Sequence, residues 1–175
     1  GEKATIGMKF SKYEYVYSHP IERKDQPSEK VPIPMELSLV DCAGQEIEKW
    51  LSDSKEMVFE GADLVFFIFG VDQWKNTAYK EDILQLLLRS HDARVTLAPE
   101  SEFYILAHKV DFLADKNKNI KEKVASITNV INDYMFSTRK QIFSFDVIPT
   151  SIMPEYRIDT FYTLLNKTIA STNVL

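Results

Sequence analysis

Segments of alternating and of continuous apolar residues divide the chain into predicted strands. Residues 8–18 alternate aromatic or aliphatic side chains with polar ones, as in a strand with one exposed face. The polar, proline-rich stretch over 19–32 predicts a hairpin loop, and residues 33–40 predict a second strand. Two later segments, Asp63–Val71 and Phe103–Ala107, are continuously apolar. That pattern is typical of strands covered on both faces in a parallel sheet.

Helical spacing of apolar residues separates these strands. The pattern predicts helices over residues 46–60, 76–89, 118–136 and 156–170, with a further strand at Phe143–Ile148. After the opening hairpin, strands and helices therefore alternate, and this order indicates an α/β fold with a mainly parallel sheet. A chain of 175 residues is most simply one domain.

Composition and charge narrow the class of protein. A formal net charge of −5 argues against nucleic-acid binding, because non-specific binding needs a basic surface. The single cysteine, Cys42, excludes an internal disulfide and fits a reducing compartment. The most apolar stretch, Leu64–Phe69, is too short to span a bilayer, and the N-terminus lacks a signal-peptide pattern. The sequence therefore predicts a soluble cytoplasmic protein without direct membrane insertion.

Polar residues follow three of the predicted strands. Asp41–Gln45 (DCAGQ) follow the second strand, His108–Asp111 (HKVD) follow a buried strand, and Pro149–Ile152 (PTSI) follow the last strand. In open α/β sheets, ligands bind outside the carboxyl ends of the strands. We therefore expect these three segments to meet at one edge of the sheet and to form the site.

The segments DCAGQE, HKVD and PTSI, in this order and at strand ends, resemble the nucleotide-binding framework of the small GTPases. They are most similar to the Rag/Gtr branch, in which His replaces the usual Asn of the guanine-recognition motif. The resemblance extends from Thr5 to about Ile169. It implies a three-layer, P-loop-GTPase-like fold, with one antiparallel edge hairpin on the mainly parallel sheet. It also implies a signalling domain that binds GTP or GDP with Mg²⁺ and hydrolyses GTP.

The resemblance gives a role to each residue of the guanine-recognition motifs. Asp111 would accept hydrogen bonds from the guanine N1–H and amino group, and adenine would leave this carboxylate unpaired. Lys109 would lay its aliphatic stem along the base, beside His108 in the place of the usual Asn. Ser151 and Ile152 would offer backbone amides to the guanine oxygen.

The same resemblance places phosphate and metal chemistry at the first motif. Asp41 and the Thr5 hydroxyl would hold Mg²⁺, which prefers oxygen ligands. Gly44 would let its backbone amide approach the γ-phosphate, because it carries no side chain. Gln45 would be the catalytic residue that orients the attacking water.

Each motif also has an interpretation without a ligand. Asp41 can be a turn residue after a strand, Lys109 and Asp111 can be a solvated surface pair, and Thr150 and Ser151 can cap a helix. The ordered set of three motifs, each at a predicted strand end, favours the G-domain interpretation.

The phosphate-binding motif G-x-x-x-x-G-K-[ST] does not occur in the sequence. None of the five glycines precedes a Lys-Ser or Lys-Thr pair. We therefore expect residues 1–175 to be a single G domain that is N-terminally incomplete, with the first strand and the P-loop missing. Three explanations stay open: the segment lies upstream, a separate polypeptide supplies it, or the chain has lost it.

Two functions are compatible with these observations. The first is a GTP-hydrolysing switch whose partners would be regulators, effectors, a second G domain in a heterodimer or a roadblock-type protein. Such partners could also recruit it to a membrane surface. The alternative is a non-hydrolysing pseudo-GTPase that serves as an assembly scaffold.

Overall fold

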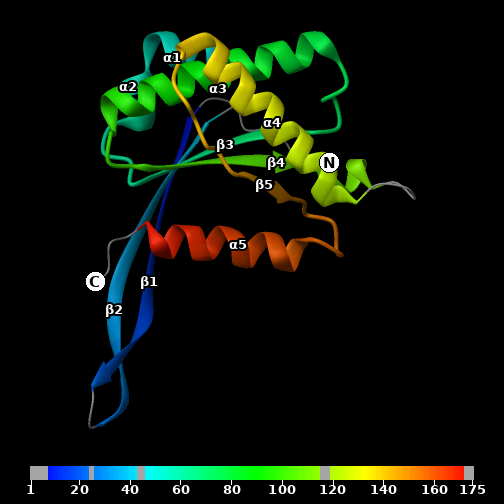
Figure 1. The fold of residues 1–175 in the computed structure, drawn as a ribbon. Coiled ribbons are helices and arrows are strands. Elements are labelled where there is room, and N and C mark those ends of the chain that lie inside the picture. Colours follow the sequence, from blue (N-terminus) through cyan, green and yellow to red (C-terminus); the bar gives the residue numbers. More distant parts are fainter. Residues whose placement is uncertain (1–7, 24–25, 43–45, 115–118, 172–175) are drawn as a thin grey trace. The chain divides into compact units, whose positions relative to one another are not determined.

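The computed structural model describes residues 8–23, 26–42, 46–114 and 119–171 (Figure 1). The chain divides into two compact units, Gly1–Trp50 and Leu51–Leu175. None of the described helices combines the length and the apolar character needed to cross a membrane.

The first unit contains a long antiparallel hairpin. Strand β1 (Met8–Arg23) pairs with β2 (Gln26–Cys42) along nearly its whole length. The hairpin loop predicted over 19–32 is therefore wrong, since the ladder continues through most of that stretch. The predicted place of the hairpin, at the edge of the parallel sheet, is not supported: among the described strands, β1 and β2 pair only with each other.

The spacing of the prolines explains how the strands continue. Pro32 and Pro34 are two residues apart on β2, and Pro20 on β1 faces Lys30, a further two residues along. Hydrogen-bonded and non-hydrogen-bonded pairs alternate along an antiparallel ladder, so these three prolines occupy the same kind of pair. The fourth proline of the hairpin, Pro27, lies where the register shifts between the Ile21 and Arg23 pairs. At a non-hydrogen-bonded pair the missing N–H removes no bond between the two strands.

The second unit is a parallel sheet covered by helices on both faces. Its strands, in spatial order, are β3 (Leu64–Gly70), β4 (Glu102–His108) and β5 (Val147–Thr150). Figure 1 shows α3 (Thr77–Leu97) and α4 (Ile120–Arg139) over one face, and α5 (Arg157–Ala170) below β5 on the other. This arrangement confirms the predicted α/β class with three layers.

The helix predicted over residues 46–60 is two shorter helices, α1 (Ile47–Asp53) and α2 (Lys55–Phe59). Ser54 between them leaves the helical region, with φ −146° and ψ 22°. Its carbonyl accepts a hydrogen bond from the Met57 N–H at 3.1 Å, which begins the second helix. Serine favours such boundaries because its side chain competes with helical hydrogen bonding.

The two faces of β3 are buried to different degrees. Phe67 and Phe69, on the side of α3, are 6% and 3% exposed, whereas Ile68 is 60% exposed. The sequence predicts that both faces of β3 are buried, and this prediction is wrong at Ile68. The reason is the position of α5, which packs on β5 and β4, with Lys167 Nζ 4.6 Å from the centre of the Tyr104 ring.

Other buried apolar side chains come from α3, α4 and the central strand: Leu84, Leu87, Leu88, Ile105, Leu106, Val124, Ile127, Ile131 and Met135.

Strand β5 begins at Val147 rather than at Phe143 as predicted. The Asn132 side chain of α4 binds the backbone just before it: its Oδ1 accepts from the Phe145 N–H at 3.0 Å, and its Nδ2 donates to the Phe145 carbonyl at 3.3 Å. An amide side chain carries the same donor and acceptor as a peptide group. Asn132 therefore replaces the neighbouring strand as the partner of this backbone segment.

Removing this side chain tests the interaction. We expect Asn132→Ala to lower the free energy of unfolding by about 1–3 kcal/mol, because it leaves a partly buried N–H and C=O without partners. Asn129→Ala, at an exposed position of the same helix, is the control and should change stability by less than about 0.5 kcal/mol. Urea unfolding measures both, and equal losses would contradict the role of Asn132.

Candidate functional site

The carboxyl ends of the three parallel strands lie in register. Gly70 at the end of β3 pairs with His108 at the end of β4, and His108 pairs with Thr150 at the end of β5. The residues that follow each strand therefore emerge side by side at one edge of the sheet. Two of the predicted motifs, HKVD and PTSI, are neighbours at this edge.

The residues predicted for phosphate and metal chemistry belong to the first unit. Asp41 lies within β2, opposite Lys9, because the strand continues past its predicted end at Val40. Thr5, Gly44 and Gln45 lie outside the described residues. In the described part of the chain, no group of three His, Cys, Asp or Glu side chains could hold a metal ion.

The chain turns sharply at Lys109. Its backbone has φ 63° and ψ 40°, the left-handed conformation that few residues with a side chain adopt. This turn carries β4 into a 3₁₀ helix, η2 (Val110–Leu113), in which Val110 is 2% exposed and anchors the segment. The Phe112 N–H donates to the Lys109 carbonyl at 3.0 Å. The turn brings Asp111 next to the end of β5.

A buried serine holds the Asp111 carboxylate. Ser151, 1% exposed, donates from its hydroxyl to Asp111 Oδ1 at 2.6 Å, and the same hydroxyl accepts from the Met153 N–H at 3.1 Å. The Ser151 N–H, predicted to face a guanine oxygen, donates instead to Thr160 Oγ1 at 3.0 Å. The Thr160 hydroxyl in turn donates to the Ser151 carbonyl at 3.1 Å. In this structure Ser151 therefore acts on the site through its hydroxyl.

His108 bridges the ends of β4 and β5. Its Nδ1 lies 3.1 Å from Oγ1 of Thr150, which is 2% exposed. Burial, and then the positive charge of Lys109, lower the pKa of His108. The ring is therefore neutral at pH 7, with one nitrogen as donor and the other as acceptor. A side-chain amide offers the same pair of functions, so this imidazole can take the place of the Asn that is usual in the guanine-recognition motif of small GTPases.

The end of β3 contributes a third side of the site, which the sequence analysis missed. Asp72 Oδ2 accepts a hydrogen bond from Lys109 Nζ at 2.9 Å. The Tyr79 hydroxyl accepts from the Gly70 N–H at 3.2 Å and donates to the Gly70 carbonyl at 2.8 Å. A signal was present in the sequence, because Asp72 follows a buried strand as closely as the three motifs follow theirs.

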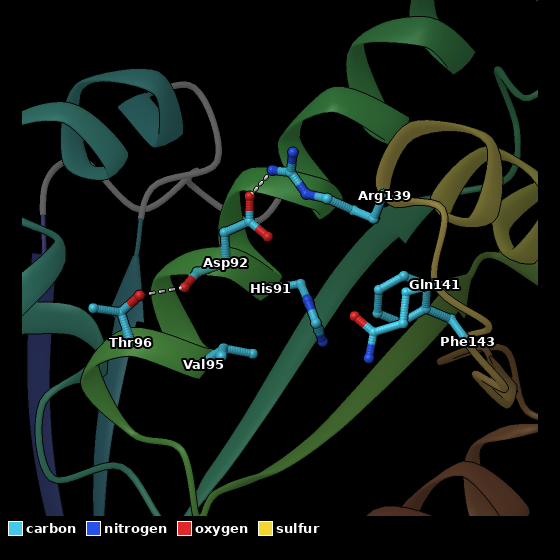
Figure 2. A pocket seen from close by; sticks show the side chains of 7 residues that line it. All are labelled: His91, Asp92, Val95, Thr96, Arg139, Gln141 and Phe143. Atoms are coloured by element: carbon cyan, nitrogen blue, oxygen red, sulfur yellow. Dashed lines mark hydrogen bonds and ion pairs between the residues drawn. The ribbon is translucent and has the colours of Figure 1, made fainter.

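A pocket of about 520 Å³ lies at the carboxyl ends of α3 and α4 (Figure 2). The candidate site lies elsewhere, at the carboxyl ends of the strands. Arg139 reaches from the end of α4 toward Asp92 on α3, and the two form an ion pair. The full set of lining residues is His91, Asp92, Val95, Thr96, Arg139, Gln141 and Phe143. None of these belongs to a predicted motif, so the pocket is separate from the candidate site.

His91, at the floor of this pocket, packs among three phenylalanine rings. Its ring centroid lies 5.6, 5.3 and 5.3 Å from those of Phe103, Phe143 and Phe145, all nearly perpendicular to it. Its Nδ1 is buried without a hydrogen-bond partner among the described residues. A ring N–H can instead point at an aromatic face, which is a weak hydrogen bond. Burial, and then the charge of Arg94, lower the pKa of His91.

Comparison with known protein families gives one match. The model described as the Gtr1/RagA G protein conserved region matches residues 23–175. A search among curated proteins gives no match. The matched segment includes the sequences DCAGQE, HKVD and PTSI.

Acid should destabilise the protein through His91 and His108. Both have a folded-state pKa below the ordinary value, so the unfolded chain takes up protons first as the pH falls. We expect the free energy of unfolding to decrease as the pH drops below about 6.5, and these rings to have no effect well above it. Urea unfolding at pH 7.5 and 5.5 measures this loss. It should be smaller in the double variant His91→Leu/His108→Asn, and an equal loss would contradict the assignment.

Proposed function

Because this chain belongs to the Gtr1/RagA family of G proteins, we propose that it is a molecular switch that hydrolyses GTP to GDP with the aid of Mg²⁺. G proteins bind guanine nucleotides. Among the described residues, those that would contact the base provide the structural support for such binding. One observation carries the proposal: Ser151 holds the Asp111 carboxylate at the sheet edge where Lys109 emerges. This arrangement supports a site that selects guanine.

Asp111 would distinguish guanine from adenine. The Ser151 hydroxyl occupies one lone pair of Oδ1, and the other lone pairs of the carboxylate remain able to accept the guanine N1–H and amino protons. Adenine presents an acceptor at N1, so it would leave the charged oxygens unpaired. Lys109 would cover the base with its aliphatic stem, and the exposed Ile152 would offer its backbone N–H to the guanine oxygen.

The phosphate and metal chemistry would come from the first motif. Asp41 and Thr5 offer carboxylate and hydroxyl oxygens, which are the ligands that Mg²⁺ prefers. When bound, Mg²⁺ would neutralise charge that develops on the phosphates. Gly44 would present its amide to the γ-phosphate, and Gln45 would orient the water that attacks it.

A second candidate, a non-hydrolysing pseudo-GTPase that acts as a scaffold, is favoured by one feature of the sequence. The motif G-x-x-x-x-G-K-[ST] is not present in these residues, and without such amides and lysine the phosphates bind weakly. Either candidate would act in the cytoplasm through protein partners: regulators, effectors, a second G domain or a roadblock-type protein. Those partners could bring it to a membrane surface.

Two measurements on the purified full-length protein separate the candidates. Mass analysis detects bound GDP or GTP, and a phosphate-release assay follows hydrolysis. Bound nucleotide together with Mg²⁺-dependent phosphate release supports the switch. A protein that binds no nucleotide, or that releases no phosphate even with an activating partner present, supports the scaffold.

Guanine selectivity should depend on Asp111. Asp111→Asn replaces two acceptors by an amide, so we expect affinity for GDP to fall by roughly tenfold to a hundredfold. The affinity for xanthosine diphosphate should rise, because the C2 oxygen of xanthine can accept a hydrogen bond from the new amide. Competition binding measures both, with Asp133→Asn, an exposed acid on α4, as the charge-matched control. Unchanged preference for guanine would remove Asp111 from the site.

Gln45 should matter more for GTP hydrolysis than for nucleotide binding. Because the side chain would act on water in the transition state, Gln45→Leu should leave nucleotide affinity nearly intact and slow hydrolysis on the order of 100-fold. Single-turnover phosphate release measures the rate, and Gln85→Leu on the exposed side of α3 is the control. Equal rates in the Gln45 variant and the wild type would rule out this role.

A further inference from the structure

The corner that follows β3 is held from two sides. The Val71 N–H donates to the His108 carbonyl at 2.9 Å, and Val71 is 3% exposed. On the other side, the Tyr79 hydroxyl of α3 binds both the N–H and the carbonyl of Gly70. The backbone that carries Asp72 is therefore fixed to β4 and to α3.

Gly70 leaves space for the Asp72 carboxylate. A Cβ atom at position 70 would lie 2.5 Å from Asp72 Oδ1, closer than two non-bonded atoms can approach. Gly70 is not among the described residues with positive φ, so the position requires space rather than a special backbone conformation. Alanine there would displace the carboxylate and leave the strand intact.

The Asp72 carboxylate directs the Lys109 side chain. The two side chains are 21% and 48% exposed, and Asp72 Oδ2 lies 2.9 Å from Lys109 Nζ. Lys109 follows β4 and Asp72 follows β3, so the aliphatic stem runs across the ends of two neighbouring strands. An unpaired lysine would sample many rotamers, and holding one of them has an entropic cost.

We propose that Asp72 is a positioning residue of the guanine site, which keeps the Lys109 stem in place to cover the base. The inference rests on the proposed guanine-nucleotide function. Asp72 acts through Lys109 as Ser151 acts through Asp111: each of the two base-contacting side chains of HKVD has its own partner on an adjacent strand end. Loss of Asp72 should therefore weaken retention of the nucleotide.

The dissociation rate of a fluorescent GDP analogue from the full-length protein tests this inference. Asp72→Asn should raise the rate by about fivefold, the upper range for a partly exposed ion pair. Gly70→Ala should have the same effect, because it moves the carboxylate without removing it. Lys109→Met should raise the rate, and the double variant Asp72→Asn/Lys109→Met should not exceed Lys109→Met alone. Added salt should reduce the difference between wild type and Asp72→Asn.

Two controls separate this inference from the proposed function. Asp82→Asn, an exposed acid on α3, makes the same change in charge and should release the analogue at the wild-type rate. Asp111→Ala tests the site itself: if wild type and this variant retain the analogue equally, the guanine site and the role of Asp72 both fail. If retention depends on Asp111, but Asp72→Asn and Gly70→Ala match the wild type, only the role of Asp72 is overturned. Independent, additive effects of Asp72 and Lys109 would overturn it as well.

Discussion

The register of the central strand determines where every described residue of the proposed base site lies. Because Gly70, His108 and Thr150 are aligned across β3, β4 and β5, the residues after each strand can reach those after the next. A slip of one residue would turn the side chains of β4 to the opposite faces and separate His108 from Thr150. Ile105 and Leu106 are close-packed on opposite faces of this strand, so such a slip would force both faces of the core to repack.

The α/β class and the meeting of HKVD with PTSI could be predicted, because long apolar runs and strand-end polarity are local signals. Features that depend on a distant partner could not. Nothing around Phe145 indicates that Asn132 replaces a strand there, and proline content alone suggested a loop where the ladder of the hairpin continues. Asp72 is an intermediate case. Its position after a buried strand could be predicted from the sequence, but its ion pair with Lys109 could not.

The two halves of the proposed chemistry come from different parts of the chain. The groups that would recognise guanine belong to one compact unit and are fixed by hydrogen bonds within it, as the Asp111–Ser151 contact illustrates. Asp41, which would bind Mg²⁺ beside the phosphates, belongs to the other unit. If the proposed function holds, substitutions in one unit would change base recognition and substitutions in the other would change hydrolysis.

Helix α3 connects two regions with different chemistry. Tyr79, near its start, binds the end of β3, while Thr96, near its end, lines the pocket beside His91. At 1.5 Å per residue these positions are roughly 25 Å apart along a stiff rod. A small tilt of α3 about its packed middle, where Leu87 is fully buried, moves both ends in opposite directions. A rigid-body movement of α3 would therefore shift the pocket wall and the corner of β3 together.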